Sequence, residues 1–269
     1  MKIEQFAVGA ASLRTARLSP LCLLALCAAC GGVDPTAEEQ PLGSSQQAVS
    51  NKDFDVDFSS CAEFVGIGLV PAANAQPFVP AGYTLAGGGG NALVVVRIAS
   101  CSGAVVDGKS VGQTTTSQVG ITLQGPDESA DINNYTVYYG TNQARLHARF
   151  EAAGLSTDNT GGLSLTLAGS SLSAVSAPAQ STDYQVSGTA VPSVPTTTFT
   201  ASWWGNGQHG VVRSRTVFPA ISFGGAATTL TTEAGSDLAT LFGGTTLTFP
   251  ILDSYNTFAA SHLEVRDQD

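Results

Sequence analysis

Short β-type segments separated by turn sequences constrain the fold of this chain more than any other feature. Each segment is rich in the β-branched and aromatic residues that favour strands, and clusters of Gly, Asn, Asp and Pro lie between them. The expected strands are residues 92–98, 119–123, 135–139, 163–167, 184–190, 198–204, 211–218, 227–232, 246–249 and 261–266. The expected turns are residues 87–90, 107–108, 125–127, 159–162, 205–207 and 224–225. This alternation predicts a mainly β protein.

Two segments interrupt the strand pattern. Residues 141–154 predict a helix, because a Thr-Asn pair can cap its start, Leu146 and Phe150 lie four residues apart on one face, and Gly154 can end it. Residues 236–242 predict a shorter second helix. So many strands would leave exposed edges unless the sheet closes. We therefore expect a single closed or cone-shaped, antiparallel-rich β-barrel with one central helix and a short second helix.

Residues 1–29 have the order of a secretory signal peptide. Basic residues come first, and an apolar stretch over 18–29 then ends in small residues. This stretch is shorter than the roughly 20 apolar residues that span a bilayer. The following sequence, residues 31–52, has no apolar period and is rich in Gly, Pro, Ser, Gln and acidic residues, which predicts a flexible tether. The folded domain is expected over residues 53–269.

The end of the signal, LCAAC at residues 26–30, resembles a bacterial lipobox. In that motif a cysteine after small residues is lipidated and becomes the new N-terminus, so the resemblance implies lipidation at Cys30 and a lipid-anchored tether over residues 30–52. The motif has Leu, Val or Ile three residues before the modified cysteine, whereas Cys27 stands there. Two localisations stay open: a lipoprotein of the cell envelope, at the outer membrane or the cell surface, or a secreted protein.

The charge balance excludes several classes of protein. The chain has 11 Lys and Arg against 21 Asp and Glu, a formal net charge of -10, which becomes -12 when residues 1–29 are removed. Such a chain repels phosphate backbones, so no nucleic-acid partner is expected. Helix-forming residues do not dominate, which excludes a coiled coil or helical bundle. With 43% hydrophobic residues, the chain is not a disordered acidic tail either.

The five cysteines reduce to one expected disulfide. Cys22 and Cys27 leave with the signal and Cys30 takes the lipid, so Cys61 and Cys101 remain. Two cysteines in an exported chain favour a disulfide between them. A metal pair is the alternative, but no CxxC motif remains and the three histidines are scattered singly. We therefore expect neither a metal site nor a cofactor.

Several stretches resemble the acetoacetate decarboxylase-like proteins. Residues 70–83, VPAANAQPFVPAGY, are similar to that family's opening VP…A…LPxG(F/Y) segment, which makes a short helix and leads into a strand. Residues 119–123, 135–139 and 141–155 are similar to its later series of strand, strand and a helix that starts near Asn-x-Ala. The resemblance covers about residues 60–265 in order and spacing. It implies that family's β-barrel.

The resemblance does not extend to the family's catalytic groups. Those enzymes use a Schiff-base lysine after Gly-Phe-Pro, with a second lysine beside it, whereas this chain has GLST at residues 154–157. Lys52 lies in the tether and Lys109 in a predicted turn, and neither has the burial or the neighbouring cation that activates an amine. The family's carboxylate on the preceding strand is also missing, and that stretch offers Ser117, Gln118 or Thr122. We expect no catalytic residue of the imine-forming kind.

Candidate ligand-binding residues come from three segments. In the run 203–215 one tryptophan should face inward and the other outward, because neighbouring strand residues alternate, and an inward Trp with a strand Arg can line a cavity. One of two adjacent tyrosines on strand 135–139 should also face inward, and the central helix carries an arginine that could bind an anion. The candidates are Tyr138, Arg145, Trp203, His209 and Arg213. Their alternatives, a core aromatic, surface arginines paired with acids and a solvated helix face, stay open.

Three further features are better explained by structure than by chemistry. Residues 108–112 match G-x-S-x-G, but no helix follows, as a nucleophile elbow requires. The glycines at 87–90 precede a strand rather than a helix, so we expect a hairpin loop instead of a phosphate site. Asp131 precedes a strand and is expected to form a turn rather than to act as a base.

Three functions stay open at this point. The first is a binding module, an exported and membrane-anchored lipoprotein whose barrel holds a small apolar, carbonyl or carboxylate ligand. The second is an enzyme, a lyase, isomerase or hydrolase that acts on a small carbonyl compound in the same cavity without a Schiff base. The third is a structural surface protein with a filled barrel. The expected partners are a small molecule and, through the lipid, a membrane; the oligomeric state stays open.

Overall fold

The computed structural model describes residues 53–127, 129–177, 182–207 and 210–268. The predicted signal peptide, Cys30 and the tether lie outside the described residues, and so does His209. The strands are β1 Phe54–Pro71, β2 Gly87–Gly88, β3 Asn91–Val106, β4 Lys109–Ser110, β5 Thr114–Thr122, β6 Ile132–Thr141, β7 Asp158–Asn159, β8 Leu163–Ala168, β9 Ser171–Ser176, β10 Tyr184–Val191, β11 Thr196–Gly207, β12 Gly210–Thr232, β13 Thr246–Thr248 and β14 Leu252–Asp267. The helices are α1 Ala72–Ala75, the 3₁₀ helix η1 Gln76–Phe78, α2 Ala144–Ala152 and α3 Asp237–Phe242.

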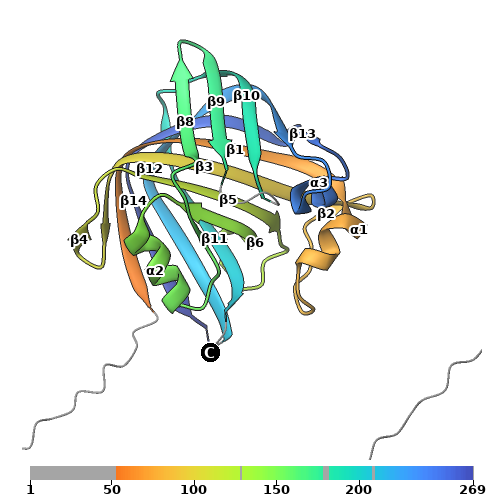
Figure 1. Cartoon of the computed structure of the whole chain (residues 1–269), viewed down its shortest axis with the longest axis horizontal. Helices are drawn as coiled ribbons and strands as arrows, with labels where there is room; N and C mark the ends of the chain where they lie inside the picture. The colour runs from red at the N-terminus through yellow and green to blue at the C-terminus, as the bar shows by residue number, and fades with distance from the viewer. Residues whose placement is uncertain (1–52, 128, 178–181, 208–209, 269) are drawn as a thin grey trace, which may run out of the picture. The chain divides into compact units, whose positions relative to one another are not determined.

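Seven strands of the single sheet close into a hydrogen-bonded ring (Figure 1). They follow the order β11-β6-β5-β3-β1-β14-β12, and pairing of β11 with β12 completes the circle. The β11–β6 pairing is parallel and the other six pairings of the ring are antiparallel. The structure thus confirms the expected mainly β fold with a closed, antiparallel-rich sheet.

Three strands outside the ring cover part of its outer face. β10 pairs with the second half of β12, and β9 and β8 continue the sheet from there. Their inward side chains join those of α1, α3 and the outer faces of β1, β3 and β5 in one buried apolar cluster. Members of this cluster include Phe64, Val70, Val96, Ile98, Ile121, Leu172, Val186, Leu230, Leu238 and Leu241. Burial on both faces explains why residues 92–98 are apolar throughout apart from one arginine.

The second apolar cluster lies inside the ring. The helix α2 closes the end of the ring at which this cluster lies. Leu146 and Phe150 of α2 are buried among inner-face residues of the ring. The Phe150 ring packs 4.4 Å from that of Tyr139 and 5.1 Å from that of Phe54, measured between ring centres. Further members are Val56, Phe58, Val106, Val212, Phe218, Ile221, Phe258, Leu263 and Val265. The predicted pair at positions 146 and 150 therefore does anchor the central helix.

Both predicted helices form, with one difference at a cap. α2 begins after Gln143 rather than after a capping Thr or Asn, because Asn142 Oδ1 instead accepts a hydrogen bond from the Thr115 backbone N–H. Gly154 follows α2 with a left-handed φ of 86°, as expected. α3 has a true N-cap, since Ser236 Oγ accepts from the Ala239 N–H at 3.0 Å. The short helix implied by the family resemblance over residues 70–83 is present as α1 and η1.

Several sheet elements differ from the sequence prediction: β2, β4, β7 and β9 are additional strands, and the predicted turn at 205–207 forms the end of β11. β1 was not predicted, because its inward alternation changes register at Ser60, which has a φ of 50°. The predicted turn at 224–225 is wrong, since β12 runs through it as one strand. The glycine at 224 is required by a close approach instead: a Cβ there would lie 2.4 Å from the Val191 carbonyl oxygen.

The predicted hairpin loop at residues 87–90 is correct. Gly89 and Gly90 both have positive φ and join β2 to β3, as a two-residue hairpin turn requires. Asp107 and Gly108 turn β3 into β4 in the same way. Ser110 of the G-x-S-x-G match therefore stands on a short exposed strand, where no nucleophile elbow can form. Within the described residues, no helix has the length and apolar character needed to cross a membrane.

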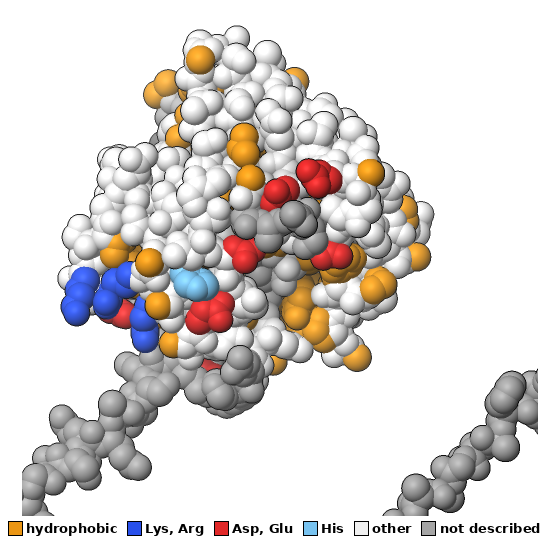
Figure 2. All heavy atoms as spheres, viewed as in Figure 1, with side chains coloured by type: hydrophobic (Ala, Val, Ile, Leu, Met, Phe, Trp, Pro, Cys, Tyr) orange, Lys and Arg blue, Asp and Glu red, His pale blue; other side chains and the backbone are white. Residues whose placement is uncertain are grey.

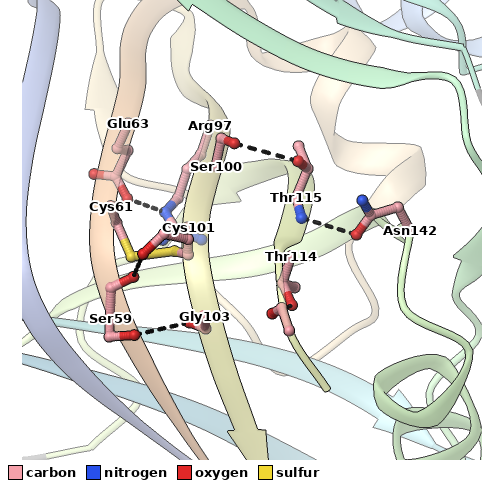
Figure 3. The surroundings of a disulfide bond; sticks show 12 residues. Ser59, Cys61, Glu63, Arg97, Ser100, Cys101, Gly103, Thr114, Thr115 and Asn142 are labelled. Carbon is pink, nitrogen blue, oxygen red and sulfur yellow. Dashed lines mark hydrogen bonds and ion pairs between the residues drawn. A yellow bond between two sulfur atoms is a disulfide. The ribbon is translucent and has the colours of Figure 1, made fainter. Parts of the chain in front are cut away.

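The expected disulfide joins the first two long strands of the ring. Cys61 on β1 and Cys101 on β3 stand directly opposite each other and are bonded (Figure 3). The bond closes a loop with a sequence separation of 40 residues.

We predict that replacing both cysteines by alanine lowers the free energy of unfolding by about 3–4 kcal/mol, the loop-entropy value for a loop of this length. Urea unfolding followed by circular dichroism measures the loss. The unsubstituted protein in reductant is the control and should lose the same amount. Equal stabilities of the oxidised protein and the double variant would contradict the prediction.

Candidate functional site

A cavity of about 80 Å³ lies inside the ring, between its inner-face side chains. Its wall is mainly apolar and aromatic, and it draws on six of the seven ring strands. The lining residues are Glu63, Val65, Ile67, Val95, Arg97, Ile132, Asn134, Phe199, Ala201, Trp203, Thr216, Phe218, Phe223, Leu252 and Asn256. An apolar wall with a few placed polar groups is the usual form of a small-molecule site.

A belt of polar side chains crosses the inner face of four neighbouring strands. Asn256 of β14 stands opposite Glu63 of β1, and Arg97 of β3 stands opposite Gln118 of β5. Glu63 and Arg97 meet diagonally across β1 and β3, with Arg97 Nε 2.5 Å from Glu63 Oε2 (Figure 3). Arg97 Nη1 donates to Gln118 Oε1 at 2.7 Å, and Asn256 Nδ2 donates to Glu63 Oε1 at 3.1 Å. Pairing between adjacent strands thus assembles the belt from residues far apart in sequence.

The belt is buried, and not all of its hydrogen-bonding capacity is used. The side chains of Glu63 and Arg97 are 3% and 14% exposed, and Asn256 is fully buried. A carboxylate can only accept, so its bond with Glu63 fixes the Asn256 amide with Oδ1 free, and this oxygen is buried without a partner. The two bonds of Arg97 use two of the five guanidinium N–H groups. The site therefore offers one acceptor and several donors.

Tyr139 borders the same belt. It stands opposite Gln118 on the inner face of β6, next to the α2 cluster. Burial raises the pKa of Tyr139 well above its usual value, and the nearby charge of Arg97 only partly offsets this. Tyr139 therefore stays a neutral phenol and adds no charge to the interior.

The two adjacent tryptophans face opposite sides, as expected. Trp203 lines the cavity. Trp204 lies on the outer face, where its Nε1–H donates to Asn133 Oδ1 at 2.7 Å and its ring lies 5.7 Å from the Arg213 guanidinium carbon. Trp203 is thus the sequence candidate that the structure places at the cavity.

Arg213 does not line the cavity, contrary to the pairing with Trp203 that the sequence suggested. It shares the outer face with Arg215, and each pairs with an acid at 2.8 Å: Arg213 with Asp127 and Arg215 with Asp131. Burial acts to raise the pKa of Asp127, but hydrogen bonds from Ser129 and Arg213 outweigh it and hold the pKa below its ordinary value. Asp131 is a structural anchor, since it also accepts from Ser202.

Tyr138 also lies outside the ring. Of the two adjacent tyrosines, Tyr139 faces inward and Tyr138 packs on the outer face under β9 and β10. Its hydroxyl is buried without a hydrogen-bond partner, and burial raises its pKa strongly. The neighbouring Tyr184 hydroxyl is paired with Ser117 Oγ at 2.7 Å. These groups belong to the covering layer and not to the cavity.

Arg145 sits on the surface side of α2. It donates to the Val106 carbonyl oxygen and lies 3.8 Å from Asp107, which also pairs with Arg149 at 2.8 Å. Figure 2 shows the Lys and Arg side chains of one face gathered at its edge, over α2 and β4. On the same helix His147 Nδ1 contacts Thr157 Oγ1 at 2.7 Å, which ties the following loop to the helix. Of the four candidates within the described residues, only Trp203 lines the cavity, and the structure does not bring the four into one site.

The cavity wall contains no lysine among the described residues. Lys109 is exposed on β4, and the segment where the family motif would place its lysine is held by Thr157, whose backbone N–H donates to Glu151 Oε1 at 2.7 Å. The described part of the chain has no group of three or more His, Cys, Asp or Glu side chains suited to a metal ion.

Sequence reasoning missed Glu63, Arg97 and Asn256. One signal was present: Arg97 is the only charged residue within the apolar run 92–98. A single charge in a strand buried on both faces needs a partner. The sequence alone does not identify this partner, because Glu63 belongs to the first strand of the domain and Asn256 to the last.

Comparison with solved structures shows which known fold this chain has. No protein-family model matches the sequence, and no curated protein matches it either. Among solved structures, the chain is similar to an acetoacetate decarboxylase, with a TM-score of 0.52 and 10% identity over 78% of this chain and 88% of the other. It is also similar to the acetoacetate decarboxylase of Legionella pneumophila, with a TM-score of 0.48 and 11% identity over 79% and 85% of the two chains. The enduracididine biosynthesis enzyme MppR complexed with pyruvate gives a TM-score of 0.49 and 14% identity over 88% and 96%.

The first of these likenesses confirms the family resemblance of the sequence at the level of the fold. The chain has an acetoacetate decarboxylase-like fold, and identities of this size say nothing more about its chemistry.

We predict that Arg97→Met lowers the free energy of unfolding by about 3–5 kcal/mol, because it leaves the buried Glu63 carboxylate uncompensated. The double variant Glu63→Leu/Arg97→Met should recover most of this loss, since neither charge is then left alone. Urea unfolding in a double-mutant cycle measures both. Arg266→Met, which breaks a pair with a half-exposed aspartate, is the control and should cost about 1 kcal/mol or less. A double variant as unstable as the single one would contradict the prediction.

Proposed function

We propose that the ring is a binding site for a small carbonyl compound with an uncharged polar head group. The observation that carries this is the Asn256 amide oxygen, which is buried at the cavity wall without a partner. A buried acceptor left unsatisfied costs about 1–3 kcal/mol, which a ligand donor would relieve. The Arg97 guanidinium, which bonds to the other oxygen of Glu63 and also lines the cavity, can donate to a carbonyl oxygen. A head group that both donates and accepts, such as a carboxamide, suits this pair.

The charges of the belt favour a neutral ligand over a carboxylate. The positive charge of Arg97 is already matched by Glu63 at 2.5 Å, so the belt as a whole is neutral. A ligand carboxylate would bring a second anion beside Glu63 and would present no donor to Asn256. Taking that charge out of water would cost several kcal/mol without a free cation to compensate it.

We predict that butanamide binds at least fivefold more tightly than butanoate, which has nearly the same shape and size. Ligand-observed NMR measures both at neutral pH. The fluorescence of a Trp204→Phe variant gives a second readout, because Trp203 at the cavity wall is then the one tryptophan. Tighter binding of butanoate than of butanamide would overturn the proposal that the ligand's head group is neutral.

Two variants locate the binding site. Glu63→Leu/Arg97→Met removes the charged part of the belt and should abolish butanamide binding. Arg215→Met removes an arginine that is also paired with an aspartate but lies on the outer face, and it should leave binding unchanged. Equal binding by all three proteins would show that the cavity is not the site.

A second candidate function is catalysis in the same cavity without a Schiff base. The observation that favours it is the Glu63 carboxylate at the wall, which could remove a proton next to a carbonyl. Its two oxygens already accept from Arg97 and Asn256, an arrangement that holds the carboxylate in place and favours binding over proton transfer. Exchange of the α-protons of 2-butanone with D₂O, followed by NMR, tests it; a rate equal to that without protein excludes this role.

We further propose that the protein is exported and anchored to the cell envelope through Cys30. The support is the sequence of residues 1–30, and Cys61 and Cys101 paired in the folded domain are compatible with an oxidising compartment.

We predict that the full chain fractionates with membranes in its producing cell and that Cys30→Ser releases it into the soluble fraction, because one thiol carries the acyl chains. Immunoblotting of the fractions measures this, and Cys27→Ser is the matched control. Unchanged membrane association of Cys30→Ser would contradict the lipid anchor.

A further inference from the structure

The cavity is too small to enclose anything beyond a head group. Its volume of about 80 Å³ is roughly half that of an engineered apolar cavity of about 150 Å³ that holds benzene. Sites that enclose whole drug-sized ligands usually measure about 300–1,000 Å³. A larger ligand must therefore extend out of the ring.

One end of the ring is partly exposed and the other is filled, so a ligand can extend out of the ring at one end. Around the polar belt the wall is buried, as Glu63, Trp203 and Asn256 show. Farther along the same inner face the lining becomes partly exposed, and Ile132 at the start of β6 is 40% exposed. At the opposite end Phe150 of α2 fills the interior. Among the described residues, the exposed part of the cavity lining thus lies away from α2.

Exposed apolar side chains surround this opening. Of the five large hydrophobic residues that are exposed in the described part of the chain, Leu69, Ile132 and Ile251 stand here. Leu69 follows the cavity residue Ile67 on the same face of β1, and Ile251 precedes the cavity residue Leu252 and donates its N–H to the Ile67 carbonyl oxygen. We call Leu69, Ile132, Ile251 and Leu252 the apolar rim. Clustered exposed apolar residues mark binding surfaces far more than scattered ones do.

The wall between the belt and the apolar rim is itself apolar. Val65 and Ile67 on β1 and Phe223 on β12 line this part of the cavity, and all three are partly exposed. An unbranched hydrocarbon chain that starts at the belt would lie against these side chains and leave over the apolar rim. Nothing in that path requires a second polar group.

We propose that the natural ligand is amphipathic, with its polar head at Arg97 and Asn256 and an unbranched apolar tail that leaves the ring over the apolar rim. Medium-chain acyl amides and compounds of the same shape are the ligand class. This inference rests on the proposed function and goes beyond it by assigning the tail and its exit.

The homologous series from butanamide to octanamide tests the tail. Each methylene group that is buried against the wall or the apolar rim should tighten binding, by up to about fourfold for full burial. Isothermal titration calorimetry measures the series on the full chain. An affinity that does not depend on chain length would overturn the proposed tail site but would leave the proposed head-group site standing. Absence of binding by butanamide and by every longer amide would overturn the proposed function and the tail together.

Two substitutions at the apolar rim separate a specific exit from general hydrophobic adsorption. Leu69→Ser and Ile251→Ser should each weaken octanamide binding severalfold and leave butanamide binding unchanged, because neither side chain lines the cavity. Val194→Ser is the control: Val194 is 89% exposed but is not part of the apolar rim, and its replacement should change neither affinity. Equal losses in all three variants would show that the tail binds elsewhere.

Discussion

The pairing of β11 with both β6 and β12 is the contact on which the rest of the structure depends. Its parallel part is short, running from Ala201 beside Ile132 to Trp204 beside Tyr135. Without it the seven strands would form an open sheet with two exposed edges and no interior. With it, every second residue of each strand must point into a closed space. The register change at Ser60 is one consequence, because it keeps Phe58 and Cys61 on the inner face of β1.

A closed interior makes the placement of charge the most informative feature of this chain. Only 12% of the residues are charged, and yet Glu63 and Arg97 are both inside the ring. A buried ion pair is weak evidence for stability, since apolar residues of similar volume often do as well or better. Stability alone therefore does not account for the belt. Its partly used hydrogen-bonding groups beside an apolar cavity are the support for the ligand site that we propose.

Local sequence signals predicted the elements whose cause is local. Spacing and residue type predicted most of the long strands, although not β1 or β9. They also predicted α2 with Leu146 and Phe150, the helix α3 and the opposite orientations of the two tryptophans. Features that depend on distant contacts were not readable. The glycines at 224–225 have the composition of a turn, and only the approach of Val191 gives them another role.

The site was harder to predict than the fold for the same reason. Alternation shows that Arg213 and Arg215 share a face of β12, but it does not say which face is inside. The bond between Asn256 and Glu63 spans 193 positions of the sequence, and only the pairing of β1 with β14 brings them together. Arg97 stood out in its apolar run, yet its role becomes clear only with both partners in place.

The disulfide connects the stability of the ring to the site. Cys61 and Glu63 share the inner face of β1, and Arg97 and Cys101 share that of β3 (Figure 3). The covalent bond therefore fixes the register of β1 and β3 at the place where Glu63 reaches diagonally to Arg97. A slip of one residue would turn one of the two charges to the outer face and leave the other buried alone. The disulfide and the charged pair of the belt are thus properties of one strand pair, and the register that the disulfide fixes is the one that the ion pair needs.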